Sequence, residues 1–158
     1  MLQIPRKVEY ALRAVVYLAN QDTERRASFK EIGESQDVPQ DFLAKIMRSL
    51  VCAGVVDSSR GSNGGYRLAR PANQITFLEV VEAADGPIAL NDCCEHGVGC
   101  SKAALCSMEQ IWRQGESAMK QVFANVRISE LACEDVLKTS AFMARAEQIG
   151  GSAPAPPR

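Results

Sequence analysis

The sequence predicts a mainly α-helical fold with a small β-hairpin wing, a winged helix-turn-helix, followed by one long helix. Three features predict it. Two short helical segments are joined by only a few residues around 36–38, a turn-rich stretch separates short strands within 55–68, and residues 107–126 carry an apolar stripe of helical period. The 158 residues are enough for one domain with appendages.

The first helix is predicted over residues 6–21. Ala11, Ala14, Val15 and Leu18 follow the i, i+3, i+4, i+7 pattern of a buried helix face. We therefore expect this helix to be largely buried in the core.

The second and third helices are predicted from their ends. Ser28 and Glu31 form a capping box, so the second helix should begin near Phe29. Pro39 suits the first turn of the third helix, and Gly54 suits the left-handed position after its end.

The wing is predicted from Val55-Val56-Asp57 and Tyr66-Arg67-Leu68, with Asn63-Gly64 as the turn because both residues tolerate positive φ. A second capping box, Thr76 with Glu79, opens a helix that should run to about Ala84.

The long helix carries an apolar stripe that consists of Met108, Ile111, Trp112, Ala118, Met119, Val122, Phe123 and Val126. The winged helix already has enough apolar residues to fill its own core. We therefore expect the stripe to pack against a second subunit rather than against its own domain. A short helical turn is expected after Ser129.

The charge is unevenly distributed along the chain. The net charge is −1, but residues 1–75 carry 11 basic and 8 acidic side chains, and residues 76–158 carry 7 basic and 11 acidic ones. Uniform basicity is therefore excluded as a source of nucleic-acid affinity. The sequence has no apolar run of about 18 residues and no apolar stretch at its start, so we expect a soluble, cytoplasmic protein that does not contact membranes.

The third helix has a polar stripe opposite its apolar face. Asp41, Ala44, Lys45 and Arg48 are spaced so that they share this stripe. In a recognition helix, Gln40, Asp41 and Ala44 would reach base edges, whereas Lys45 and Arg48 would contact phosphates. The alternative is a solvated face with an Asp41–Lys45 ion pair.

The wing tip strengthens the DNA-binding interpretation. Arg60 begins a glycine-rich tip and could enter a narrow minor groove, where the negative potential is enhanced. The alternative is an ordinary hairpin with an exposed arginine. The full set of predicted DNA contacts is Ser28, Gln40, Asp41, Ala44, Lys45, Arg48, Arg60, Gly61 and Asn63.

Six cysteines in a chain without an export signal indicate metal binding or redox chemistry. Five residues separate Cys94 from Cys100, and another five separate Cys100 from Cys106. Three thiolates with this spacing can hold an iron–sulfur cluster. Structural zinc prefers tighter cysteine pairs, and a thiol switch would use Cys93 with Cys94 and Cys100. All three interpretations remain open from spacing alone. The isolated Cys52 and Cys133 stand in apolar helical contexts and are expected to be buried and inert.

The chain resembles the Rrf2 family of bacterial regulators, of the IscR, NsrR and RirA type, over about residues 1–140. The resemblance rests on the start Val8-Glu9-Tyr10-Ala11-Leu12-Arg13, the wing from Arg60-Gly61-Ser62-Asn63-Gly64-Gly65 to Tyr66-Arg67-Leu68, and the three-cysteine loop. It implies a homodimeric transcription factor in which a cluster held by Cys94, Cys100 and Cys106 controls the affinity for promoter DNA.

The resemblance also bears on the fourth cluster ligand. Where IscR-like members carry a histidine three residues after the third cysteine, this chain has Glu109. NsrR-like members use an acidic residue on the first helix of the partner subunit, which Glu9 matches. Glu9 is therefore preferred, ahead of His96, Cys93 and Glu109, and the alternative for Glu9 is an ion pair with Arg13.

We accordingly expect four segments: a winged helix-turn-helix DNA-binding domain over 1–86, a cysteine-rich cluster-binding loop over 87–106, a dimerisation helix and short terminal helix over 107–140, and a disordered tail over 141–158. The expected function is a homodimeric regulator that binds a palindromic operator in double-stranded promoter DNA. Its [4Fe–4S] or [2Fe–2S] cluster would sense iron–sulfur status, nitric oxide or redox state, with repression or activation as the outcome. The rivals are a cluster-free thiol redox switch and an iron–sulfur electron carrier. An enzyme is not expected, because no acid/base or nucleophile–base arrangement stands out.

Overall fold

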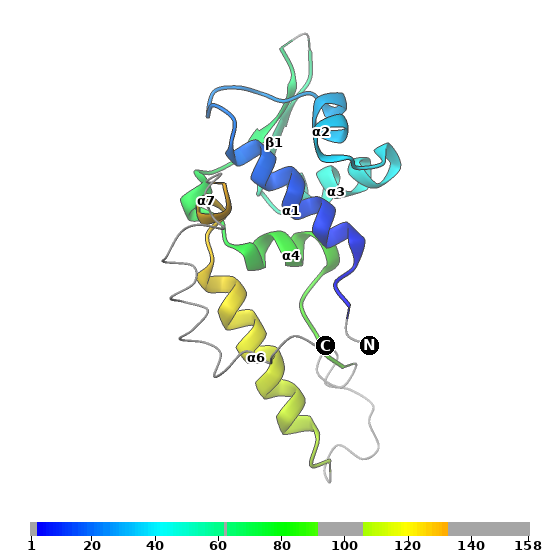
Figure 1. The fold of residues 1–158 in the computed structure, drawn as a ribbon, viewed down its shortest axis with the longest axis vertical. Helices are drawn as coiled ribbons and strands as arrows, with labels where there is room; N and C mark the ends of the chain where they lie inside the picture. The colour runs from blue at the N-terminus through cyan, green and yellow to red at the C-terminus, as the bar shows by residue number, and fades with distance from the viewer. Residues whose placement is uncertain (1–2, 62, 92–105, 133–158) are drawn as a thin grey trace, which may run out of the picture.

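The computed structural model describes residues 3–61, 63–91 and 106–132, and it has the predicted winged helix-turn-helix fold (Figure 1). Its elements, in chain order, are α1 (Arg6–Ala19), α2 (Phe29–Gln36), α3 (Gln40–Cys52), β1 (Val56–Ser59), β2 (Gly65–Leu68), the 3-10 helix η1 (Ala72–Gln74), α4 (Phe77–Asp85), α6 (Glu109–Asn125) and α7 (Ile128–Leu131).

The core forms around α1, which contacts α2, α3, α4 and α7. Helix α1 buries Val8, Ala11, Ala14, Val15 and Leu18, as its periodicity predicts. Helix α3 adds Leu43, Ile46, Met47 and Leu50 from its apolar face. Helix α7 closes the core with the fully buried Ile128, whose N–H donates to the carbonyl of Ile75 at 2.9 Å.

The helix-turn-helix is fixed by its caps. The capping box is present at the start of α2, and Asp37 ends that helix in the left-handed conformation with φ of 50°. Pro39 is the N-cap of α3 rather than part of its first turn, and Gly54 follows α3 with φ of 68°. The reversal between the two helices is therefore only three residues long.

The wing confirms the predicted hairpin but not its turn. Strands β1 and β2 are antiparallel, and the sheet gains an isolated bridge between Ala27 and Tyr66. Among the described residues of this region the positive φ angles fall on Gly61 and Gly65, not on Asn63-Gly64, so the two-residue turn prediction was wrong. The connection spans five residues, and Gly64 is needed for close approach because a Cβ there would lie 2.5 Å from the Ser59 carbonyl oxygen.

Helix α6 extends away from the winged helix (Figure 1), and none of its residues is buried. It touches the rest of the chain through Phe123, whose ring centroid lies 4.8 Å from that of Phe77, and through Gly115, which faces Leu90. The N-terminal part of its apolar stripe is open: Met108 is 62% exposed and Ile111 is 64% exposed.

Several predictions concern residues outside the described ranges. Cys93, Cys94, His96 and Cys100 lie outside them, as do Cys133 and the tail 141–158. The described residues contain no helix that could span a lipid bilayer.

The close contact between Gly65 and Ala27 predicts that position 65 cannot accept a side chain without loss of stability. Gly65 has φ of 146°, and a Cβ there would lie 2.6 Å from the Ala27 carbonyl oxygen. Gly65→Ala should therefore lower the free energy of unfolding by about 1 to 3 kcal/mol, measured by urea denaturation.

Gly33→Ala is the matched control, because its Cβ would meet Leu43 Cδ2 at an ordinary 3.4 Å. This control should leave stability unchanged or raise it by about 0.5 to 1 kcal/mol. Equal stability of the two variants would contradict the tight contact.

Candidate functional site

Helix α3 presents the predicted polar stripe to solvent. Gln40, Asp41, Ala44, Lys45 and Arg48 are all exposed, opposite the buried apolar face. Asp41 and Lys45 do not form the i,i+4 ion pair of the alternative interpretation. Both side chains are therefore available to an external partner.

Basic side chains in the described ranges divide into two groups. Ion pairs engage most of them; these are Lys7, Arg13, Arg25, Arg26, Lys30, Arg67, Arg70, Arg113 and Lys120. By contrast, five basic side chains form no ion pair with a carboxylate in the described part of the chain: Arg6 and Arg127, and the three on α3 and the wing tip, Lys45, Arg48 and Arg60. Unpaired cations on the recognition helix and wing tip are what phosphate binding requires.

The wing is held to the helical domain by Arg26. This half-buried guanidinium donates to Asp57 Oδ2 at 2.7 Å and to the Gly65 carbonyl at 3.3 Å, so it contacts both strands. The hydrogen bond from Arg26 lowers the pKa of the Asp57 carboxyl group, with Arg67 Nε adding to the effect from 3.5 Å. The exposed tip residues Arg60, Gly61 and Asn63 thus project from an anchored hairpin.

Ser28 and Phe42 complete the surface. Ser28 is exposed, and its hydroxyl oxygen accepts the Glu31 N–H at 3.2 Å, which leaves its own O–H free to donate outward. Phe42 was missed by the sequence analysis: it lies in the first turn of α3, is 50% exposed, and its ring meets Tyr10 edge-on with centroids 6.1 Å apart. An aromatic residue among the polar residues of that turn was the available signal.

Glu9, the preferred fourth ligand, is exposed on α1 and forms the predicted alternative, an ion pair with Arg13. Arg13 also donates to the carbonyl oxygen of Gln36 at 3.4 Å. Gln36 is the last residue of α2. One guanidinium thus joins the candidate ligand to the carboxyl end of the helix that precedes α3.

Cys106 is the described member of the three-cysteine set. Its thiol is free and partly buried, just before α6. It borders a hollow of about 380 Å³ whose other lining residues are Glu109, Gln110, Arg113, Gln114 and Ser117. Glu109 accepts a hydrogen bond from Arg113 Nε at 2.9 Å. Within the described ranges, no three metal-ligating side chains come together. The other two predicted cysteine ligands, Cys94 and Cys100, lie outside them.

Comparison with known proteins identifies the family. Residues 4–134 match the family described as Rrf2, iron-dependent transcriptional regulator. The chain belongs to the Rrf2 family. As an Rrf2 protein it is a transcriptional regulator, and regulators of this family bind DNA, often as dimers.

Relatives and solved structures agree with this assignment. Protein aau3 of Rhizobium meliloti (strain 1021) is 32% identical over 131 residues, which cover 82% of this chain and 84% of aau3. The structure of CymR, described as the global cysteine regulator of B. subtilis, aligns with a TM-score of 0.67 at 29% identity and covers 84% of this chain and 97% of CymR. T. potens IscR has the same fold, with a TM-score of 0.66 at 21% identity over 97% of this chain and 94% of IscR.

The Arg26–Asp57 contact makes wing anchoring sensitive to acid. Because the pKa of Asp57 is lowered in the folded protein, the ion pair stabilises the fold fully above about pH 4. That contribution is lost as the pH falls through the lowered folded-state pKa. Asp57→Asn should therefore lose less stability than the wild type between about pH 5 and pH 2, measured by urea unfolding. Asp41→Asn, at an exposed site without an ion pair, should follow the wild-type curve.

Proposed function

We propose that this Rrf2 protein is a homodimeric regulator that binds a palindromic operator in cytoplasmic promoter DNA and whose affinity is set by an iron–sulfur cluster. The observation that carries the DNA-binding part is the unpaired state, within the described ranges, of Lys45, Arg48 and Arg60. Leaving three cations without partners on one surface favours a polyanionic ligand.

Helix α3 would lie in the major groove. Gln40, Asp41 and Ala44 stand in or near its first turn, where side chains reach base edges. Lys45 and Arg48 lie further along the same exposed face and would neutralise phosphates.

The flanking elements would extend this contact. Arg60, with Gly61 and Asn63, would enter the adjacent minor groove from the wing tip, which is exposed. Ser28 would donate its hydroxyl to a backbone phosphate, since the first helix of a helix-turn-helix crosses the DNA backbone.

The open stripe of α6 supports a homodimer. Met108, Ile111 and Trp112 are large apolar side chains that this chain leaves exposed. They continue into a groove of about 300 Å³ whose lining includes Ile4, Val8, Val81, Leu90, Met119 and Phe123. A second copy related by a two-fold axis would cover both surfaces, because such an interface is self-complementary. We therefore assign residues 107–140 to dimerisation and residues 1–86 to DNA binding.

The cluster, [4Fe–4S] or [2Fe–2S], would be held by Cys94, Cys100 and Cys106 of the 87–106 segment, with Glu9 of a second subunit as fourth ligand. The family's description as iron-dependent supports iron, and the free Cys106 thiol beside an open hollow is a suitable donor. When bound, the cluster would supply a centre that responds to iron supply, nitric oxide or oxidants.

Arg13 offers a route from that centre to the DNA-binding surface. Its guanidinium is shared between the Glu9 carboxylate and the Gln36 carbonyl. If Glu9 is engaged elsewhere, Arg13 loses its ion-pair partner and can strengthen its bond to the carboxyl end of α2. A shift of α2 would move α3, because the two helices are joined by only three residues.

Two rivals make different predictions. A thiol switch would bind DNA under control of oxidants but contain no iron. An iron–sulfur electron carrier would have no use for the unpaired cations of α3 and the wing, and its binding to duplex DNA would not depend on salt in the manner of phosphate contacts.

Cys106→Ala tests the cluster. The variant should remain folded because Cys106 lies outside the buried core, but anaerobic protein should lose its visible absorbance. Its affinity for an operator selected from random duplexes should change by roughly 5- to 150-fold. The control is Cys52→Ala, which should keep the full spectrum. The prediction that Cys52 is buried was wrong, because this last residue of α3 is exposed, off the helix's buried face. A coloured Cys106→Ala protein with wild-type iron and sulfide content would refute the ligand assignment, and colourless wild-type protein would favour the thiol switch.

Ile111→Asp tests the dimer. Because Ile111 is exposed in the single chain, the substitution should leave the fold intact but place an unpaired charge in the proposed interface. Dimerisation should weaken by at least about 3 kcal/mol, roughly a hundredfold, in sedimentation equilibrium. Gln121→Asp, at an exposed position away from the stripe, should stay dimeric. An unaltered Ile111→Asp dimer would show that another surface joins the subunits.

A further inference from the structure

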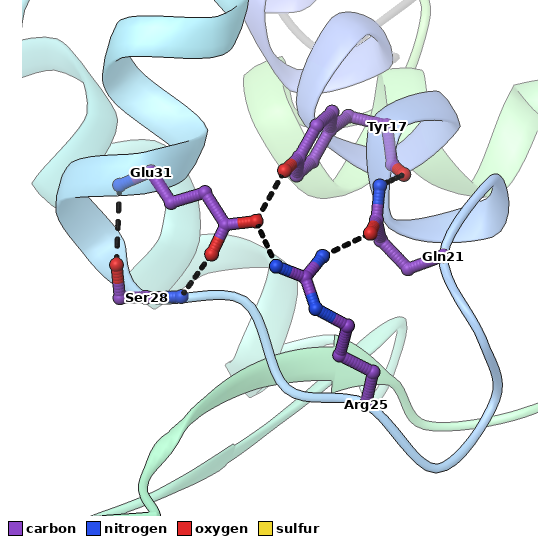
Figure 2. A network of polar contacts seen from close by, with 5 residues as sticks. All are labelled: Tyr17, Gln21, Arg25, Ser28 and Glu31. Carbon is purple, nitrogen blue, oxygen red and sulfur yellow. Dashed lines mark hydrogen bonds and ion pairs between the residues drawn. The ribbon is translucent and has the colours of Figure 1, made fainter.

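The amino end of α2 carries a network of five residues, Tyr17, Gln21, Arg25, Ser28 and Glu31 (Figure 2). Glu31 is at its centre. One carboxylate oxygen, Oε1, accepts from the Tyr17 hydroxyl at 2.6 Å and from Arg25 Nη2 at 2.6 Å. The other, Oε2, accepts the N–H of Ser28 at 3.4 Å and completes the capping box. Arg25 is held in turn by Gln21.

The network places a negative charge beside a proposed DNA contact. The hydrogen bond from Tyr17, with smaller effects of Arg25 and the Ser28 N–H, lowers the pKa of Glu31, so its carboxylate is ionised at neutral pH. It lies one hydrogen bond away from the exposed Ser28. A carboxylate at that position repels DNA phosphates, and the paired guanidinium of Arg25 offsets the repulsion.

The chain contains a second capping box with the same construction. At the start of α4, Glu79 Oε2 accepts the N–H of Thr76 at 2.7 Å, and Glu79 Oε1 accepts from Arg70 Nη2 at 2.8 Å. This box lies next to α7, since Thr76 bridges to Arg127, and Figure 1 shows it away from α2. An arginine on the capping glutamate is therefore a shared structural device. Only the copy on α2 stands beside the proposed DNA surface.

We propose that Arg25 is a positioning residue for DNA binding, which neutralises Glu31 and so lets the amino end of α2 approach the phosphate backbone. This inference rests on the proposed function, in which α2, α3 and the wing form the DNA interface. Glu31 has two separable roles: its side-chain oxygens cap α2, and its charge opposes DNA. Glutamine retains the first role and lacks the second.

The experiment compares Arg25→Met, Glu31→Gln, the double variant and Arg70→Met. The affinity of the full chain for its selected operator is measured by fluorescence anisotropy at about 50 to 200 mM salt. Arg25→Met should bind roughly three- to tenfold more weakly at the lowest salt, and the loss should shrink as salt rises. Glu31→Gln should bind at least as tightly as the wild type. The double variant should return to within about twofold of it, because the repelling charge is gone.

Arg70→Met is the matched control, because it removes the same charge from the equivalent box and should leave the affinity unchanged. Thermal melts separate folding defects from binding defects, and Glu31→Gln tests the charge without removing the arginine. The inference is overturned if Arg25→Met binds like Arg70→Met, or if the double variant binds as weakly as Arg25→Met. Lys45→Ala tests the proposed function separately. If both Lys45→Ala and Arg25→Met bind the operator with wild-type affinity, the DNA does not bind at the surface formed by α2, α3 and the wing.

Discussion

The arrangement of this molecule depends on an apolar stripe on α6 whose N-terminal part, with Met108 and Ile111, is exposed in the single chain. The winged helix closes its core with residues from α1, α3, α4 and α7, and Ile128 completes that core at the far end of α6. Helix α6 itself contributes no buried residue. Exposure of these large apolar side chains to water is unfavourable, and contact with a second copy of the chain is the simplest way to bury them. In the proposed homodimer, two winged helices joined in this way would bind two half-sites.

Some basic side chains, like the exposed part of the apolar stripe, lack a partner within the described part of the chain. Carboxylates neutralise most basic side chains of the described residues, for example Arg26 with Asp57 and Lys120 with Glu116. The recognition helix and wing tip differ, with Lys45 and Arg60 left without such partners in the described ranges. A chain with a net charge of −1 can therefore bind a polyanion through one surface, because the local distribution of charge, not its sum, sets the potential there.

Local signals explain which predictions succeeded. The two predicted capping boxes, at the starts of α2 and α4, and Gly54 mark helix ends through bonds or backbone angles only a few residues away, so the sequence alone was sufficient. The wing turn was misplaced because the bridge between Ala27 and Tyr66, 39 positions apart, controls the backbone at its second strand. Arg26 pairs with Asp57 across 31 positions, and Phe42 owes its orientation to Tyr10 on another helix. Such contacts exist only after the chain has folded, so no local pattern predicts them.

The most direct test of the account varies the distance between the two half-sites of the selected operator. A dimer with its winged helices held at a fixed separation recognises half-sites on one face of the DNA, about one helical turn apart. Inserting about 5 base pairs turns one half-site to the opposite face, whereas about 10 restores the face. The loss of affinity caused by the first insertion should be at least about tenfold larger than the loss caused by any base-pair substitution outside the half-sites. Equal affinity for every spacing would contradict it, because the winged helices would then act independently.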